Sequence, residues 1–145
     1  MKKFIVFIAL FSFVLLFSIE NHCKNFPEIQ KKKIVRSLVN GIDSENVGLK
    51  VSAALRVFEF IQQGYLTRSD FSTAVIPLMK MLREGKSEIE RIAAALSLYE
   101  IEDGRGIYSL CGTAKFDDSE RVRNISKNLY YQHHINKGTT YLVRY

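Results

Sequence analysis

Two stretches decide the fold of this chain: Arg91-Ile-Ala-Ala-Ala-Leu-Ser-Leu-Tyr-Glu100 and its near copy Lys50-Val-Ser-Ala-Ala-Leu-Arg-Val-Phe-Glu59. The offset between them is 41 (91 − 50 = 41), and a weaker match of residues 91–93 to residues 124–126 gives an offset of 33 (124 − 91 = 33). Offsets of this size are typical of stacked helical repeats. The Ala and Ser residues let a neighbouring helix approach closely, and the larger apolar residues one turn away fill the core.

The rest of the body carries the same helical pattern. Apolar residues recur at spacings of three and four, and no segment alternates with period two for long enough to indicate a sheet. Pro77 lies inside one stripe and predicts a kink or a split near Ile76. The stripes and the turn signals between them predict six helices in three pairs, at residues 27–40 with 45–62, 67–84 with 86–101, and 104–115 with 119–134.

Length and composition indicate one folded domain. The chain has 145 residues, of which 47% are hydrophobic and 25% are charged, as is ordinary for a globular protein. Only 2 Pro and 8 Gly occur, which suits long helices better than many short strands. The formal net charge of +6 favours acidic proteins, anionic lipid or nucleic acid as partners, but it does not choose among them.

The N-terminal part of the chain, residues 1–23, has the pattern of a targeting segment. Lys2 and Lys3 precede an uncharged, strongly apolar run, Phe4–Ile19. This run is shorter than a typical spanning helix and close to the core of a signal peptide, and its positive flank predicts export of the following domain. Because no small-x-small cleavage pattern follows, two predictions stay open: a periplasmic or secreted protein, or an uncleaved anchor with the domain outside the cytoplasm.

The chain therefore divides into three parts: a signal peptide or uncleaved anchor at residues 1–23, a helical repeat domain at 27–134, and a C-terminal tail at 135–145. The tail is rich in Tyr and is expected to cap the exposed last pair or to dock onto a partner. Cys23 and Cys111 can form a disulfide only if Cys23 is retained, and the alternative is a buried free thiol at Cys111.

Residues 91–110 also resemble a known repeat. Their sequence RIAAALSLYEIEDGRGIYSL contains an Ala-rich helix, an apolar residue, Asp, any residue, Arg, and a short helix that ends in Leu. This order resembles the HEAT-like repeat of the phycobilisome-lyase type, and DSERVR at 118–123 is similar to the start of the second helix of a following repeat. The resemblance covers about residues 43–132. The chain departs from the pattern in its uneven period and in Gly106, where the family usually has Ala.

The resemblance implies an all-α fold, a short α-α superhelix (a HEAT-like solenoid) of about three helix pairs after the N-terminal signal or anchor. It implies structural roles for five residues, which are Asp103, Arg105, Asp118, Val122 and Arg123. Asp103 would cap or orient a turn, and Arg105 and Arg123 would bond carbonyls or carboxylates between repeats. Some relatives handle chromophores, some bind alkylated DNA and most are scaffolds, so the resemblance alone does not assign a chemistry.

No catalytic or cofactor motif is present in the sequence. A nucleophile needs an activating base, and beyond residue 23 the only histidines are His133 and His134. Adjacent histidines on a helix point about 100° apart and do not form the i, i+4 pair that grips a metal. The Gly-Arg-Gly at 104–106 lacks the Lys-Ser/Thr of a phosphate loop. We expect a non-enzymatic protein without a cofactor, a metal or a small-molecule substrate.

Two charged surfaces are candidates for binding. Exposed polar residues on the second helix of each pair would form a partner-binding face made of Lys50, Arg56, Glu90, Arg91, Arg123 and Lys127. A basic patch follows the apolar run and would rest on anionic lipid if that run stays in the membrane; its residues are Lys31, Lys32, Lys33 and Arg36. For both surfaces the alternative is simply the solvated side of a helix.

Three functional hypotheses follow from the sequence. The first is binding or scaffolding of another protein outside the cytoplasm. The second is a structural module at a membrane surface, anchored by residues 4–19. The third is a HEAT-like enzyme or nucleic-acid binder, which the positive charge favours slightly and export disfavours.

Overall fold

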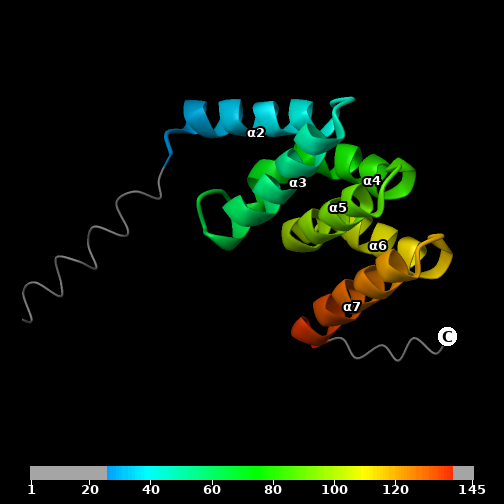
Figure 1. Ribbon diagram of the computed structural model, residues 1–145. Coiled ribbons are helices and arrows are strands. Elements are labelled where there is room, and N and C mark those ends of the chain that lie inside the picture. The colour runs from blue at the N-terminus through cyan, green and yellow to red at the C-terminus, as the bar shows by residue number, and fades with distance from the viewer. Residues whose placement is uncertain (1–25, 139–145) are drawn as a thin grey trace, which may run out of the picture.

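The protein is helical throughout the part of the chain that the structure describes. The structure is a computed structural model, and it describes residues 26–138, among which there is no strand (Figure 1). This confirms the predicted all-α class. The predicted signal or anchor at residues 1–23 and residues 139–145 of the predicted tail lie outside the described residues. The helices are α2 (Glu28–Ile42), α3 (Val47–Gln62), the 3-10 helix η1 (Arg68–Ala74), α4 (Val75–Glu84), α5 (Glu88–Ile101), α6 (Gly104–Phe116) and α7 (Glu120–Asn136).

The predicted helices agree with the observed ones except in the second pair. There the single helix expected at residues 67–84 is two elements, η1 and α4, which meet between Ala74 and Val75. Pro77 falls in the first turn of α4, where a missing N–H breaks no helical hydrogen bond. The split therefore lies close to its predicted position. At the other end, α7 continues through residue 136, so the predicted tail at 135–145 begins too early.

Short polar side chains fix where the helices begin. The side chains of Asn46, Ser87, Asp103 and Ser119 each accept a hydrogen bond from a backbone N–H in the first turn of the helix that follows. At the start of η1, the side chain of Asp70 accepts hydrogen bonds from the backbone N–H and the hydroxyl of Thr67, both at 2.7 Å. These bonds satisfy N–H groups that have no partner within the helix, so each boundary is encoded locally.

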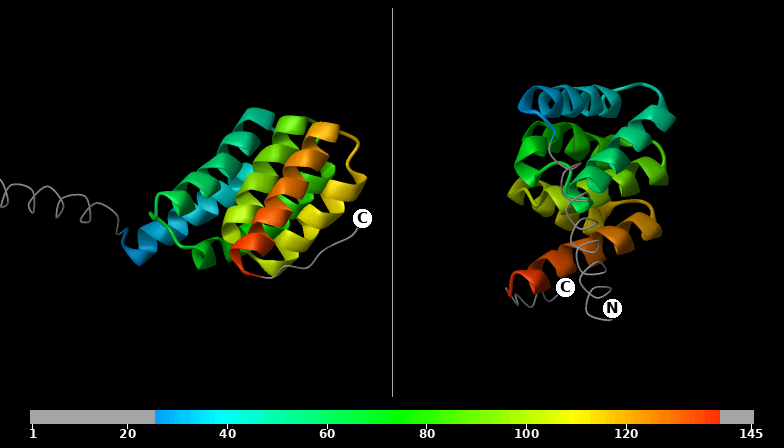
Figure 2. Two further views of the ribbon diagram at one scale, coloured as in Figure 1. Left: turned by 90° about the horizontal axis from the view of Figure 1, so that it is seen from below. Right: turned by 90° about the vertical axis from the view of Figure 1, so that its left-hand side faces the viewer.

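The helices form three antiparallel pairs placed side by side. The pairs are α2 with α3, α4 with α5, and α6 with α7, and the second helices α3, α5 and α7 lie next to one another in a single layer (Figure 2). The first helices α2, α4 and α6 form the other layer, to which η1 adds a turn against α2. The two end helices α2 and α7 therefore lie at opposite ends of the molecule (Figure 1).

Small residues set the distances between neighbouring helices, both within a layer and between the two layers. Ala54 and Ala94 are fully buried, and the hydroxyl of Ser97 lies 2.7 Å from the carbonyl oxygen of Ala54, which joins α5 to α3. A Cβ added at Gly41 would lie 2.8 Å from the Cβ of Ala53, closer than real Cβ contacts come, so α2 and α3 cross where only glycine fits. Gly106 is similarly tight, because a Cβ there would lie 3.0 Å from the side chain of Leu98.

The N-caps and the burial pattern show how the three second helices correspond in sequence. The offset from Asn46 to Ser87 is 41 (87 − 46 = 41), as predicted from the near copies, but the offset from Ser87 to Ser119 is only 32 (119 − 87 = 32). With an offset of 32, the buried Ala94 of α5 corresponds to the buried Ser126 of α7. The offset of 33 inferred from the sequence is therefore one position too long.

Candidate functional site

Three cations of the predicted partner-binding face are engaged within the fold. Lys50, Arg91 and Arg123 occupy the same position, four residues after the N-caps of α3, α5 and α7. Lys50 Nζ lies 3.6 Å from Glu90 on α5. Arg91 pairs with Asp117 at 2.9 Å and donates to the carbonyl of Gly85, while Arg123 donates to the carbonyls of residues 117 and 118. These side chains hold helix ends and neighbouring pairs together.

Glu90 departs from the expectation that it is exposed, because only 1% of it is accessible to solvent. Its Oε2 accepts hydrogen bonds from the backbone N–H and the hydroxyl of Ser87, at 2.9 and 2.8 Å. Burial favours the neutral carboxyl, but the bonds from Ser87 and the charge of Lys50 outweigh it, so the pKa of Glu90 is lowered. Glu90 is therefore a buried cap and does not belong to an exposed binding face.

The two remaining members of that face do not meet. Arg56 is exposed on α3 and pairs with Glu59 at 2.8 Å. Lys127 is exposed on α7, where its Nζ lies 5.9 Å from the ring centre of Tyr131. The whole of α5 separates these helices. The structure therefore does not bring the six predicted residues together into one charged binding face.

The residues to which the repeat resemblance assigned structural roles act locally. Asp103 is the N-cap of α6, and the Arg105 guanidinium bonds both of its oxygens, at 3.0 and 3.1 Å. These bonds from Arg105 hold the pKa of Asp103 below its usual range. The predicted bonds of Arg105 and Arg123 between repeats are wrong. Asp103 and Arg105 share one turn, and Arg123 donates to carbonyls of the loop between α6 and α7, within its own pair. Val122 is fully buried, and Asp118 contributes its carbonyl to Arg123.

The two adjacent histidines do not form a metal site. His133 is buried, and burial together with the charge of Lys137 lowers its pKa, which keeps the ring neutral near pH 7. The rings of His133 and His134 lie 5.5 Å apart and nearly perpendicular. Among residues 26–138, no three His, Cys, Asp or Glu side chains are grouped so as to hold a metal ion. Cys111 is a partly exposed free thiol, and Cys23 lies outside the described residues.

A groove between α4 and α6, which was not predicted from the sequence, is bordered by two exposed aromatic rings. Tyr108 and Phe116 are 80% and 82% exposed, and they lie on one side of α6, two turns apart, with Gly112 between them. Nothing lies within 4 Å of a Cβ placed at Gly112, so the space between the rings is open. The groove has a volume of about 430 Å³ and a mostly apolar lining: Met79, Leu82, Arg83, Tyr108, Ser109, Gly112, Thr113, Phe116 and Asp117.

The sequence carries a weak signal for this groove. Residues 108, 112 and 116 have the i, i+4, i+8 spacing of one helix side, but the same helix also contains the buried Ile107 and Leu110. Periodicity alone does not show which of two apolar sides meets the core, because that depends on where α4 and α7 lie. The exposure of the aromatic side becomes evident only in the packed structure.

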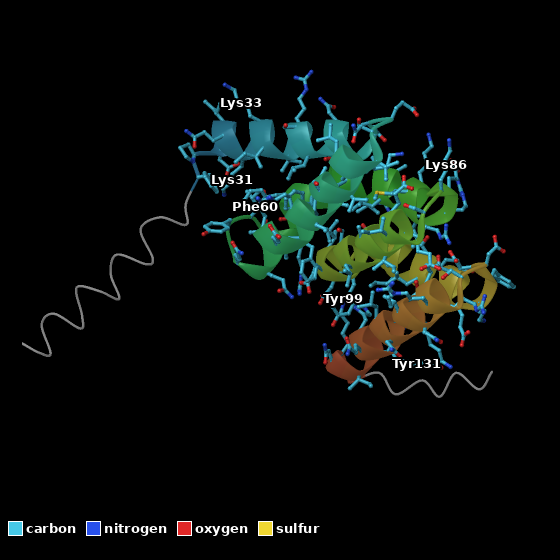
Figure 3. The ribbon with its side chains drawn as sticks, in the orientation of Figure 1. Lys31, Lys33, Phe60, Lys86, Tyr99 and Tyr131 are labelled. Carbon is cyan, nitrogen blue, oxygen red and sulfur yellow. The ribbon has the colours of Figure 1, made fainter. Side chains whose placement is uncertain are left out.

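A second groove lies between α2 and η1, beside the predicted basic patch. Its volume is about 460 Å³, and most of its surface area is apolar although six of its eight lining residues are polar or charged. The residues are Glu28, Lys31, Lys32, Val35, Arg36, Val39, Asp70 and Thr73. Lys31 pairs with Glu28 at 2.9 Å, whereas Lys33 points away from the other helices (Figure 3). The four predicted cations thus share one helix, but only three of them face solvent freely.

A third, open cleft at the far ends of α3 and α5 is polar. Arg68 spans it, donating to the carbonyl of Glu100 at 2.9 Å and pairing with Glu102 at 2.9 Å. Gln62 and Lys137 add bonds to the same two acidic residues. These hydrogen bonds and ion pairs hold the helix ends around the cleft together.

Comparisons with known proteins identify no relative. No protein-family model, no curated protein and no solved structure matches the chain. The HEAT-like resemblance thus remains a prediction based on residues 91–110 and 118–123. Within residues 26–138, none of the helices combines the length and the apolarity that crossing a bilayer requires.

Proposed function

We propose that this chain is a non-catalytic HEAT-like repeat module that binds another protein outside the cytoplasm, and that the partner docks in the groove between α4 and α6. The observation that carries the proposal is the pair of aromatic side chains, Tyr108 and Phe116, each at least 80% exposed beside an apolar groove. Aromatic residues are enriched at the centres of protein interfaces, where a few of them supply most of the binding free energy.

The repeat character is supported by equivalences between the pairs. Each second helix begins at a polar N-cap and carries a cation four residues later, at Lys50, Arg91 and Arg123. In two of the three pairs this cation contacts an acidic side chain of the next unit along the chain. Such nearest-neighbour contacts are what hold a helical solenoid together.

The chemistry of the groove favours a particular kind of partner. Met79 and Leu82 offer apolar surface, and the exposed Arg83 at the rim is paired with Glu84 at 2.7 Å. The one carboxylate in the lining, Asp117, is already held by Arg91. The best complement is therefore a segment with one or two apolar anchors, such as an amphipathic helix laid between the rings.

The proposal is tested first by crosslinking in the native host. A photoreactive phenylalanine analogue replaces Tyr108 or Phe116, and Ile89, an exposed apolar residue on α5, serves as the matched control position. We expect one protein to be captured from both groove positions and not from position 89. Equal capture from all three positions would contradict a specific groove.

The captured protein is then purified and its affinity is measured directly. Tyr108→Ala and Phe116→Ala should each weaken binding by about 2 kcal/mol, roughly 30-fold, as expected for buried aromatic anchors. Both side chains are exposed in the free protein, so neither variant should change its thermal stability. An Ile89→Ala control should bind like wild type, and wild-type affinity in both groove variants would refute the proposal.

A further inference from the structure

The outer side of α2 combines exposed cations with an exposed apolar residue. Lys32, Lys33 and Arg36 all face solvent, as does Ile29, which is 73% exposed. On a helix wheel these four residues fall within about 100° of arc, on the side away from the buried Ile42. Because α2 is the first helix of the first pair, no other described element covers this side (Figure 3).

The charge of this side is not neutralised within the fold. In residues 26–138, no acidic side chain forms an ion pair with Lys32, Lys33 or Arg36. The two carboxylates in the adjoining groove are already engaged. Glu28 pairs with Lys31, and Asp70 accepts bonds from the backbone and the hydroxyl of Thr67, both at 2.7 Å.

Asp70 carries a negative charge in this groove, and that charge is used within the fold. Burial alone would raise its pKa, but the hydrogen bonds from Thr67 and the charge of Lys31 outweigh burial, and the pKa is lowered. Asp70 is therefore occupied as the cap of η1. The cations at the edge of the groove keep a net positive field above an apolar floor made of Val35 and Val39.

The position of α2 in the chain adds a separate argument. The apolar run Phe4–Ile19 ends only nine positions before α2 begins (28 − 19 = 9). A connection of this length spans at most about 30 Å. If the run enters a bilayer, α2 is held within that distance of the lipid headgroups.

We propose that α2 is a docking surface for an anionic membrane, beyond the protein-binding function proposed for the α4–α6 groove. Lys32, Lys33 and Arg36 face the lipid phosphates, and Ile29 enters the headgroup boundary. Apolar contact and cationic attraction act together in peripheral helices of this kind. Membrane docking of α2 leaves the α4–α6 groove, on other helices, available to a partner protein.

The test is vesicle flotation of the full chain. Two kinds of vesicle are compared: phosphatidylcholine alone, and phosphatidylcholine mixed with phosphatidylglycerol as the minor, anionic component. The readout is the partition coefficient for the anionic vesicles divided by that for phosphatidylcholine vesicles. Insertion that does not depend on lipid charge contributes equally to both coefficients and cancels in this ratio. A triple variant with Lys32→Gln, Lys33→Gln and Arg36→Gln should lower this ratio about 100-fold at low salt, the effect expected for three surface cations.

The matched control changes net charge equally but elsewhere. Its substitutions fall at exposed cations on other elements: Lys80→Gln, Lys86→Gln and Arg121→Gln. Lys2 and Lys3 are present in every variant, so their effect is common to all. An equal loss in both triple variants would overturn the proposal, since total charge would then explain binding. A wild-type affinity for duplex DNA higher than that for the anionic vesicles would also overturn it.

The apolar contribution has a separate control of matched exposure. Ile29→Ser should weaken binding to both kinds of vesicle several-fold without changing their ratio. Ile135, on α7 at the opposite end of the molecule, is also 73% exposed, and Ile135→Ser should leave binding unchanged. Equal weakening by both substitutions would overturn the assignment of Ile29 to the membrane contact.

Discussion

The contact between α3 and α5 differs in chemistry from the contact between α5 and α7, although both join neighbouring helices of one layer. The Ser97 hydroxyl bonds a carbonyl of α3, and Glu90 faces Lys50 across the first contact. At the positions of α7 that correspond to Ala94 and Glu90, Ser126 and Val122 are fully buried, and the Ser126 hydroxyl has no hydrogen-bond partner among the described residues.

Small side chains are common to both contacts, whereas the Ser97 hydroxyl bond and the pair of Glu90 with Lys50 belong to the first. Ala53, Ala94 and Ser126 all lie where a neighbouring helix passes closely, and each is small and buried. Of these three residues only Ser126 carries a hydroxyl, and it forms no hydrogen bond among the described residues. The three positions therefore share a small volume, whereas the hydrogen bond of Ser97 belongs to a different position of α5.

Enlarging a small residue at the first contact should have the largest effect. Ala54→Leu forces a larger side chain against α5 at a fully buried site, next to the carbonyl that Ser97 bonds. We expect a loss of about 3 kcal/mol in the free energy of unfolding, the upper range for overpacking. Urea denaturation measures it, with Ser52→Leu on the exposed side of α3 as the control. A loss under about 1 kcal/mol would show that the helices separate easily and that size is not limiting.

Neutralising Glu90 should give a smaller, pH-dependent loss that is confined to the first contact. Glu90→Gln keeps the shape but weakens the bonds from Ser87 and removes the pair with Lys50, so we expect a loss of about 1–2 kcal/mol at pH 6. Because the pKa of Glu90 is lowered by folding, its stabilisation is present above the ordinary pKa of 4.5 and is lost as the pH falls through the folded value.

The difference between wild type and Glu90→Gln should therefore shrink between pH 6 and pH 3 in thermal unfolding. A Val122→Ala variant at the corresponding position of α7 is the control, because it removes volume and no charge. Its loss of stability should be nearly independent of pH. A constant difference for Glu90→Gln across this range would contradict the role of its charge.

Removing single hydroxyls should give the smallest effects, with opposite signs at the two contacts. Ser97→Ala loses the hydroxyl that lies 2.7 Å from the Ala54 carbonyl and should cost about 1 kcal/mol. Ser126→Ala removes a buried hydroxyl without a partner in the described part of the chain and should be neutral or stabilise the fold by up to about 1 kcal/mol. The free energy of unfolding of both variants is measured by urea denaturation. Equal losses in the two variants would contradict the difference in hydrogen bonding between the two contacts.

Much of the fold follows from sequence because its signals are local. N-caps such as Asn46 and Ser87 bond N–H groups in the first turn that follows them, and Pro77 breaks the helix near where it stands. The candidate site was less accessible to sequence reasoning. Glutamate is a residue type usually found at the surface, yet Glu90 is buried as a cap. Phenylalanine is usually buried, yet Phe116 is exposed.

Most helix starts, the all-α class and the offset of 41 between the N-caps of α3 and α5 follow from the residue order alone, since caps and apolar stripes act within one or two turns. The offset of 32 between the N-caps of α5 and α7, the partners of Lys50 and Arg91, and the exposed aromatic groove became evident only once the helices were packed. Burial and pairing depend on which surface of a neighbouring helix arrives within a few ångströms, and that distance is a property of the packed chain as a whole.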